Sequence, residues 1–181
     1  LKIRRRWPHS YPWWQPAVEI INYEGVNYND FDLFKHDGFV NFDTFKSYYD
    51  EGFTALISNV LDLTAELRSL ERKLTLGFGS PINANFYMSK GTKTQTASFP
   101  AHEHEYDVIV KQLHGASDWL IDGGPLIAHK DDVIVIPKGT QHQVVTVPEE
   151  RLSLTINFNW WEIMYDIVFI SYEEPNACLL Y

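Results

Sequence analysis

The chain has 181 residues, of which 45% are hydrophobic and 22% are charged, a composition that excludes a disordered or fibrous protein. This length suits one domain with a sizeable core. The formal net charge of −9 argues against a nucleic-acid-binding protein, which normally presents a basic face. The single cysteine, Cys178, excludes an internal disulfide and favours a reducing, cytoplasmic location. No apolar run is long enough to cross a membrane, so we expect no membrane partner.

Residues 1–36 are rich in aromatic side chains and prolines and begin with a basic cluster. The prolines at positions 8, 12 and 16 are incompatible with a helix, so we predict an extended aromatic-rich N-terminal arm that packs on an apolar surface. The simplest interpretation of the basic cluster is a solvated terminal segment.

Two helices are expected next, with a buried strand over residues 53–60 between them. Asp43 is the expected N-cap of the first helix, and Gly52 is expected to end it. Asp62 is the expected N-cap of the second helix, and Gly77 is expected to end it. The second helix places four leucines at helical spacing, namely Leu63, Leu67, Leu70 and Leu74.

From residue 82 onward, short apolar segments alternate with turn residues, a pattern typical of a β-sandwich or barrel. The expected strands are 83–88, 105–114, 117–121, 132–137, 142–147 and 151–158. Residues 159–181 fit either a helix or a strand. Because the N-terminal arm and the Trp160-Trp161 pair are very apolar, we predict that 159–181 is a packing or oligomerisation segment and that the protein is a homodimer.

Three histidines form the most informative pattern in the chain. His102 and His104 are two residues apart, a spacing that on a strand directs both imidazoles to one side. His142 follows about forty residues later, after a turn that contains Pro137 and Gly139. Neutral imidazoles are good transition-metal ligands, and three of them leave coordination positions open. We therefore predict one divalent metal held by His102, His104 and His142, with Fe(II) as first choice and Ni, Zn, Mn or Cu as alternatives.

The other four histidines have no comparable neighbouring motif and are interpreted as ordinary residues: His9, His36, His114 and His129.

Strand alternation indicates which polar residues share a face with one another. Asn85 and Tyr87 form one such set, and Ser153, Thr155 and Asn157 form another. If these residues face inward, they suit a small polar ligand; in the alternative, they face water and the apolar residues between them face the core. Both arrangements stay open. Gln112 has the same strand parity as the histidines, which predicts a hydrogen bond inside the barrel.

The two histidine segments resemble the two motifs of the cupin superfamily, His-x-His followed by a glycine and then Pro-x-Gly-x-x-His. In this chain the segments run from Pro100 to Gly115 and from Pro137 to His142. Over roughly residues 37–158 the sequence resembles the Jumonji-C-like branch that includes the ribosomal oxygenases. The resemblance implies a mainly β fold, a double-stranded β-helix of the cupin or jelly-roll type, with two or three peripheral helices. Members of that branch are iron- and 2-oxoglutarate-dependent oxygenases that hydroxylate protein side chains.

Two positions depart from this branch. His104 stands where the branch has an aspartate, and Ser117 stands where a Lys or Arg binds 2-oxoglutarate. A hydroxyl can hydrogen-bond a carboxylate but supplies no ionic contact. Lys90, Lys93 and Lys111 are candidate replacement cations, although Lys111 has the wrong strand parity. The resemblance and the strand parity together give four expected cofactor-binding residues: Asn85, Tyr87, Ser117 and Thr155.

Three functions fit these observations. The first is a metal-dependent oxygenase that acts on a small molecule or a peptide, with 2-oxoglutarate as a candidate co-substrate. The second is a three-histidine dioxygenase or isomerase that needs no keto acid. The third is a barrel that binds a small ligand or a metal without turnover. The sequence indicates no separate acid or base, so we assign no catalytic residue beyond the metal ligands.

Overall fold

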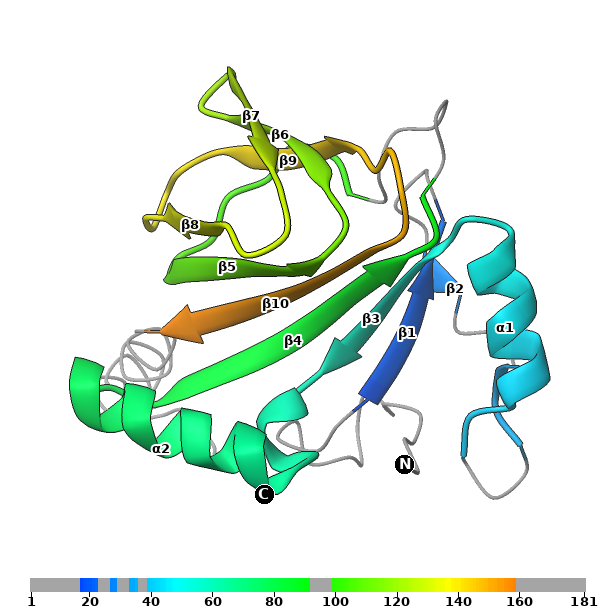
Figure 1. Ribbon diagram of the computed structural model, residues 1–181, viewed down its shortest axis with the longest axis horizontal. Helices are drawn as coiled ribbons and strands as arrows, with labels where there is room; N and C mark the ends of the chain where they lie inside the picture. The colour runs from blue at the N-terminus through cyan, green and yellow to red at the C-terminus, as the bar shows by residue number, and fades with distance from the viewer. Residues whose placement is uncertain (1–16, 23–26, 29–32, 36–38, 92–98, 159–181) are drawn as a thin grey trace, which may run out of the picture.

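The computed structural model describes residues 17–22, 27–28, 33–35, 39–91 and 99–158. Within them the fold is mainly β, with two antiparallel sheets and two α-helices (Figure 1). The larger sheet has the strand order β2 (Asn27–Tyr28), β1 (Ala17–Ile21), β3 (Thr54–Ser58), β4 (Ile82–Ser89), β10 (Arg151–Phe158), β5 (Asp107–His114) and β8 (Val133–Ile136). The smaller sheet has the order β7 (Gly124–Ala128), β6 (Ser117–Ile121) and β9 (His142–Thr146).

The smaller sheet lies over the β10-β5-β8 end of the larger one and forms a barrel with it (Figure 1). The core between them is built by alternate residues of facing strands, because only every second side chain of a strand points inward. Val108 and Val110 of β5 pack there with Ile134 and Ile136 of β8 and with Trp119 of β6. This arrangement confirms the predicted double-stranded β-helix.

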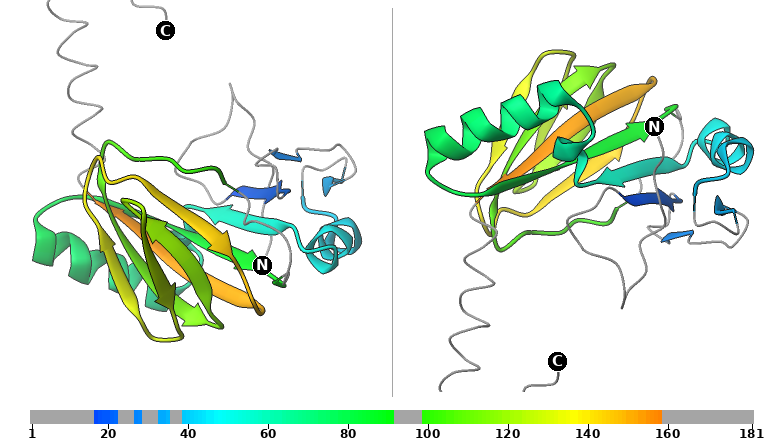
Figure 2. Two further views of the ribbon diagram at one scale, coloured as in Figure 1. Left: turned by 90° about the horizontal axis from the view of Figure 1, so that it is seen from above. Right: turned by 90° about the horizontal axis from the view of Figure 1, so that it is seen from below.

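A second core lies on the opposite face of the larger sheet, under helix α2 (Ala65–Phe78) (Figure 2). Leu70 and Leu74 of α2 pack against Ile82 and Ala84 of β4 and against a second group of residues from the 3₁₀ turn η2 (Val60–Asp62) and β10. Of the predicted leucine stripe, Leu63, Leu70 and Leu74 thus pack against this core and are partly buried, with Leu63 just before the helix. Helix α1 (Phe42–Asp50) lies beside β1, at the other end of the larger sheet (Figure 1).

The predicted N-cap of α1 was wrong by two positions. The helix begins at Phe42 with Asn41 as N-cap, and Asp43 lies in its first turn. Asp43 cannot cap the helix because it already has helical backbone geometry, whereas an N-cap residue is extended, as Asn41 is. The helix ends at Asp50, two residues before Gly52, whose positive φ of 95° turns the chain toward β3.

Both predicted ends of α2 were also displaced by two residues. Thr64, not Asp62, is the N-cap, and its Oγ1 accepts a hydrogen bond of 3.2 Å from the Leu67 N–H. Asp62 instead belongs to the preceding 3₁₀ turn. Gly79, not Gly77, follows the helix in the left-handed conformation, with φ 68°, that allows a C-terminal cap.

The strands expected at 53–60 and from residue 82 onward all form, with ends that differ from the structure by no more than two residues. Strand β7 was not predicted, because it begins with Gly124 and Pro125, which normally argue against a strand. Proline is tolerated here because β7 is an edge strand that pairs only with β6. Asp122 and Gly123, both at positive φ, form the two-residue turn between these strands.

Part of the predicted N-terminal arm is described, and it includes strands β1 and β2 of the larger sheet. β1 pairs antiparallel with β3, and Val18 and Ile20 are buried. The basic cluster and the segment 159–181 lie outside the described residues, so the domain boundaries remain predictions. None of the helices in the described part has the length and apolar character needed to span a membrane.

Candidate metal centre

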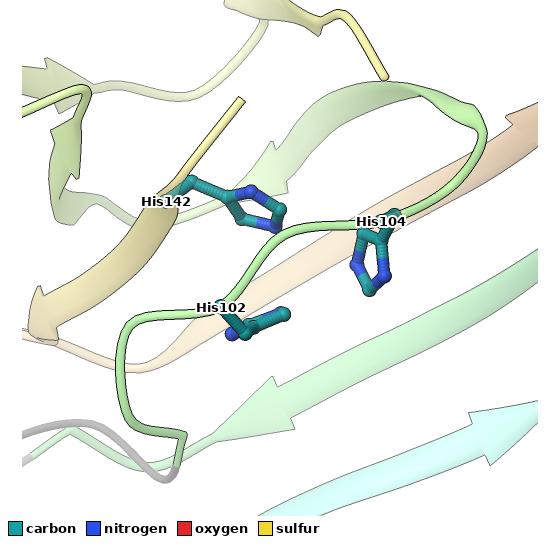
Figure 3. A group of neighbouring side chains, drawn as sticks. All are labelled: His102, His104 and His142. Atoms are coloured by element: carbon teal, nitrogen blue, oxygen red, sulfur yellow. The ribbon is translucent and has the colours of Figure 1, made fainter. Parts of the chain in front are cut away.

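The three predicted ligands come together at one point of the barrel (Figure 3). The ligand atoms of His102, His104 and His142 all lie within 4.8 Å of one another. The ring centroids are 4.9 Å apart for His102 and His104, 4.5 Å for His102 and His142, and 5.1 Å for His104 and His142. Two sequence segments about forty residues apart therefore build one imidazole cluster.

The backbone fixes this cluster in a different way from the one expected. His102 and His104 precede β5 rather than lying on a regular strand. His102 forms an isolated antiparallel bridge with His142, the first residue of β9. The carbonyl of His104 accepts a hydrogen bond of 2.9 Å from the Gly139 N–H, which ties it to the turn before β9.

Two of the imidazoles are oriented by backbone carbonyls. Nδ1 of His102 lies 2.8 Å from the Pro100 carbonyl, and Nδ1 of His142 lies 2.9 Å from the Thr140 carbonyl. A carbonyl only accepts hydrogen bonds, so each Nδ1 carries the proton and each Nε2 keeps its lone pair. Such outer hydrogen bonds are the usual way in which proteins orient histidine ligands toward a metal.

The environment keeps the imidazoles of His104 and His142 neutral. Burial, followed by the neighbouring rings of His102 and His142, lowers the pKa of His104 to about 4. Burial also lowers the pKa of His142, although its hydrogen bond to Thr140 acts in the opposite direction. At neutral pH both rings are in the form that binds a metal.

The donor set fits a divalent transition metal, because three imidazole nitrogens converge on one point. Glu103 and Glu105 are exposed, and neither belongs to the cluster. The described residues thus supply three nitrogen ligands and no carboxylate at this point. The bound cation would keep its full charge and open coordination positions.

The imidazole cluster borders a cavity of about 230 Å³. Its lining is mainly apolar, with a few polar side chains from β4 and β10. The lining residues are Leu56, Tyr87, Phe99, His102, His104, Val108, Val110, Trp119, His142, Val144, Arg151, Ser153 and Thr155. A largely apolar cavity with a few placed polar groups is the usual form of a small-molecule site.

Of the four residues expected to bind a cofactor, Tyr87 and Thr155 line the cavity, and Asn85 and Ser117 do not. Asn85 uses its Oδ1 to accept a hydrogen bond of 3.2 Å from the Asn59 N–H. Ser117 is fully buried, and its hydroxyl is already engaged by two neighbours, Gln112 and Trp119.

The sequence left open whether the polar residues of β10 face inward or face water, and the structure decides between these two arrangements. Ser153 and Thr155 face the cavity, whereas Leu154 and Ile156 pack under α2. Both faces of β10 are covered, because the barrel lies on one side and the helix on the other. The predicted inward hydrogen bond of Gln112 is confirmed: its Oε1 accepts from the Ser153 hydroxyl at 2.7 Å.

Sequence reasoning missed Arg151, which lines the cavity and is 3% exposed. Its guanidinium donates one hydrogen bond, of 3.3 Å from Nε to the Ser89 hydroxyl. The sequence contained a signal for this position, because Arg151 lies on the same side of the alternating strand as Ser153 and Thr155. The lysines considered as replacement cations do not line the cavity where they are described. Lys90 pairs with Asp50 and Lys111 with Asp131.

With this geometry described, the chain can be compared with known proteins. Residues 90–159, which include the three histidines and Arg151, match the family model described as the AraC-like ligand binding domain. The barrel has the double-stranded β-helix fold. The finer assignment to the Jumonji-C-like branch remains a prediction. A comparison with curated proteins finds no match.

Proteins of known structure show a limited likeness to this chain. KdgF from Halomonas sp. has 21% identity and a TM-score of 0.39, over 46% of this chain and 73% of that one. A cupin 2 conserved barrel domain protein from Leptotrichia buccalis has 23% identity and a TM-score of 0.39, over 43% and 36%. The DMSP lyase DddQ from Ruegeria pomeroyi DSS-3 has 21% identity and a TM-score of 0.39, over 45% and 40%. The matched part thus spans well under two thirds of the last two proteins.

Proposed function

We propose that this protein is a metal-dependent oxygenase of the cupin type, in which His102, His104 and His142 hold one divalent cation, with Fe(II) as first choice. The observation that carries the proposal is the convergence of three imidazoles, with ligand atoms within 4.8 Å of one another, at the wall of a cavity. Resemblance to the Jumonji-C-like oxygenases supports this reaction class. When bound, such a cation supplies Lewis-acid and redox chemistry at its open coordination positions.

The protein side chains orient the substrate and exclude water. Val108, Trp119 and Val144 give the cavity an apolar wall next to the imidazoles. Burial raises the pKa of Tyr87 to about 12, so its phenol keeps its proton and can donate a hydrogen bond to a bound molecule. A cavity of about 230 Å³ fits a small organic substrate, which favours a small molecule over a long peptide.

The surroundings of Ser117 favour the form of this enzyme that needs no keto acid. Its hydroxyl accepts a hydrogen bond of 2.9 Å from Trp119 Nε1 and donates one of 3.2 Å to Gln112 Oε1. Its donor is therefore already used, and it stands behind the residues that line the cavity. We propose that the substrate occupies the cavity directly and that Ser117 does not hold 2-oxoglutarate.

Ligand binding without turnover is the second candidate, and the match to an AraC-like ligand binding domain favours it. One experiment separates the two functions. The protein is loaded with Fe(II) without oxygen, its metal content is measured, and oxygen uptake is then followed with a panel of small organic molecules, with and without 2-oxoglutarate. Uptake that needs the metal and a panel member supports the oxygenase. Stoichiometric metal and a bound ligand without uptake would assign the binding function.

We also propose a cytoplasmic homodimer, from the lone Cys178 and the apolar terminal segments. Sedimentation velocity at micromolar concentration tests the dimer. A single species with the mass of one 21.1 kDa chain would contradict it.

A further inference from the structure

The cavity contains a positive charge, that of Arg151, for which the described residues provide no ion pair. Arg151 is 3% exposed, and none of the ion pairs among the described residues involves it. The cavity lining includes no Asp or Glu. Burial lowers the pKa of Arg151 to about 10, which still leaves the guanidinium protonated at neutral pH. A buried charge without a partner is costly, so a protein normally keeps one only where something else pairs with it.

Further hydrogen-bond donors lie on the same wall of the cavity. Ser89 and Tyr87 of β4 stand opposite Arg151 and Ser153 of β10 in the sheet register. Arg151 and Tyr87 are close enough that each affects the pKa of the other. The hydroxyls of Tyr87 and Thr155 make no hydrogen bond within the part of the chain that the structure describes. The hydroxyl of Ser153, in contrast, already donates to Gln112.

We propose that this cavity takes a small organic acid, whose carboxylate binds the Arg151 guanidinium and accepts a hydrogen bond from the Tyr87 hydroxyl. The inference deepens the proposed function and rests on it, since the acid occupies the cavity that adjoins the metal ligands. The planar fork of a guanidinium matches the two oxygens of a carboxylate.

Size and charge identify the ligand class further. The cavity, about 230 Å³, is smaller than the ~300–1,000 Å³ that is usual for drug-sized ligands, so the acid has few carbons. Its apolar wall, formed by Val108, Trp119 and Val144 among others, accommodates a hydrocarbon portion. A neutral ligand would leave Arg151 unpaired. A single guanidinium matches a carboxylate, with one negative charge, better than a phosphate dianion.

Calorimetric titration of metal-free and of Zn(II)-loaded protein tests the inference without any turnover. The probes are butyrate and succinate, the neutral amide butyramide, and inorganic phosphate. The variant is Arg151→Met, which keeps a long side chain and removes the charge. Arg68→Met is the matched control, because Arg68 is exposed on α2, away from the cavity, where its Nη1 donates a hydrogen bond to the Asp62 carbonyl. Arg151→Lys keeps the charge and loses the planar fork.

At least one of the two acids is expected to bind the metal-free protein at least tenfold more tightly than butyramide, a difference of about 1.4 kcal/mol. Arg151→Met should lose this preference, Arg151→Lys should keep part of it, and Arg68→Met should keep all of it. The acid should also raise the melting temperature of the wild type but not that of Arg151→Met. Because the metal-free protein is used, this result stands even if no metal or oxygen chemistry is found.

Three results would overturn the inference. The first is equal binding of butyramide and the two acids to the wild type, or no binding of either acid. The second is binding of phosphate in place of the acids. The third is an unchanged preference for the acid in Arg151→Met. If Arg151→Met fails to fold, the comparison of acid and amide on the wild type and Arg151→Lys still decides the question.

Discussion

His102 and His142 exchange a pair of backbone hydrogen bonds, with N···O distances of 3.0 Å from the His102 N–H and 2.8 Å from the His142 N–H. This pairing places the start of β9 against the segment before β5. The two side chains that leave this bridge meet at ring centroids 4.5 Å apart. The same two residues thus fasten the backbone and present the ligands, so ligand spacing depends on a main-chain contact.

Replacing one of these ligands should abolish stoichiometric metal binding. In His142→Ala the backbone pairing is retained, since alanine keeps the N–H and the carbonyl, but one of three nitrogen donors is lost. We expect metal content to fall from about one equivalent to a small fraction, measured by mass spectrometry of the metal after gel filtration. His129→Ala is the control, because His129 is exposed and lies outside the cluster. Full metal retention in His142→Ala would show that the cluster is not the metal site.

The sequence predicted the strands and the histidine cluster because both depend on local patterns. Alternating apolar residues and turn residues mark strands such as β5, and the two histidine segments have fixed spacings. The pairing of His102 with His142 is a long-range contact, yet the position of His142 after the Pro137 turn was enough to predict that the rings meet. Only the detail that the first pair precedes β5 was missed.

The role of Arg151 could not be predicted from local sequence patterns. A strand pattern shows which side of β10 a residue faces, but whether a charge there finds a partner depends on the neighbouring strand. Ser89 stands opposite Arg151 in the register of β4 and β10, and it offers a hydroxyl rather than a carboxylate. The register is set by tertiary packing, so the missing partner becomes visible only in the folded chain.

Gly115, the glycine that follows the first histidine segment, should not tolerate a side chain. Its φ is +65°, and a Cβ would come within 1.9 Å of the Glu150 carbonyl oxygen, next to Arg151. We expect Gly115→Ala to lower the free energy of unfolding by about 2–5 kcal/mol, the sum of the left-handed backbone cost and the clash. Gly123→Ala is the matched control, because Gly123 has a φ of +76° but open space around it.

In that control only the backbone cost applies, about 1–2 kcal/mol. Both variants are compared with the wild type by urea denaturation. Equal losses of stability would show that the contact between Gly115 and Glu150 is not tight in solution.

The capping residue of α2 can be identified by a pair of alanine variants. Thr64 accepts a hydrogen bond from the Leu67 N–H, so Thr64→Ala should lower the free energy of unfolding by about 1 kcal/mol. Asp62→Ala should change it by less than about 0.5 kcal/mol, because Asp62 is exposed in the preceding turn. Thermal or chemical denaturation measures both effects. A larger effect at Asp62 would restore the cap expected from the sequence.

Gln112 should be the most important polar residue of the barrel interior. It is 1% exposed, and its Oε1 accepts hydrogen bonds from Ser153 and Ser117, at 2.7 and 3.2 Å. Gln112→Leu keeps a similar volume but leaves two buried hydroxyls without this acceptor, at a cost of about 1–3 kcal/mol for each buried group left unsatisfied. Because Ser153 lines the cavity, the variant should also weaken ligand binding.

The exposed Gln141 provides the control for this prediction. Gln141→Leu makes the same chemical change where no buried hydroxyl loses its acceptor, so its stability should stay within about 0.5 kcal/mol of the wild type. Chemical denaturation gives the stability of both variants, and the titration of small acids gives their binding. If Gln112→Leu matches Gln141→Leu in both measurements, the buried hydroxyls have found other acceptors. The wall of the cavity would then not depend on Gln112.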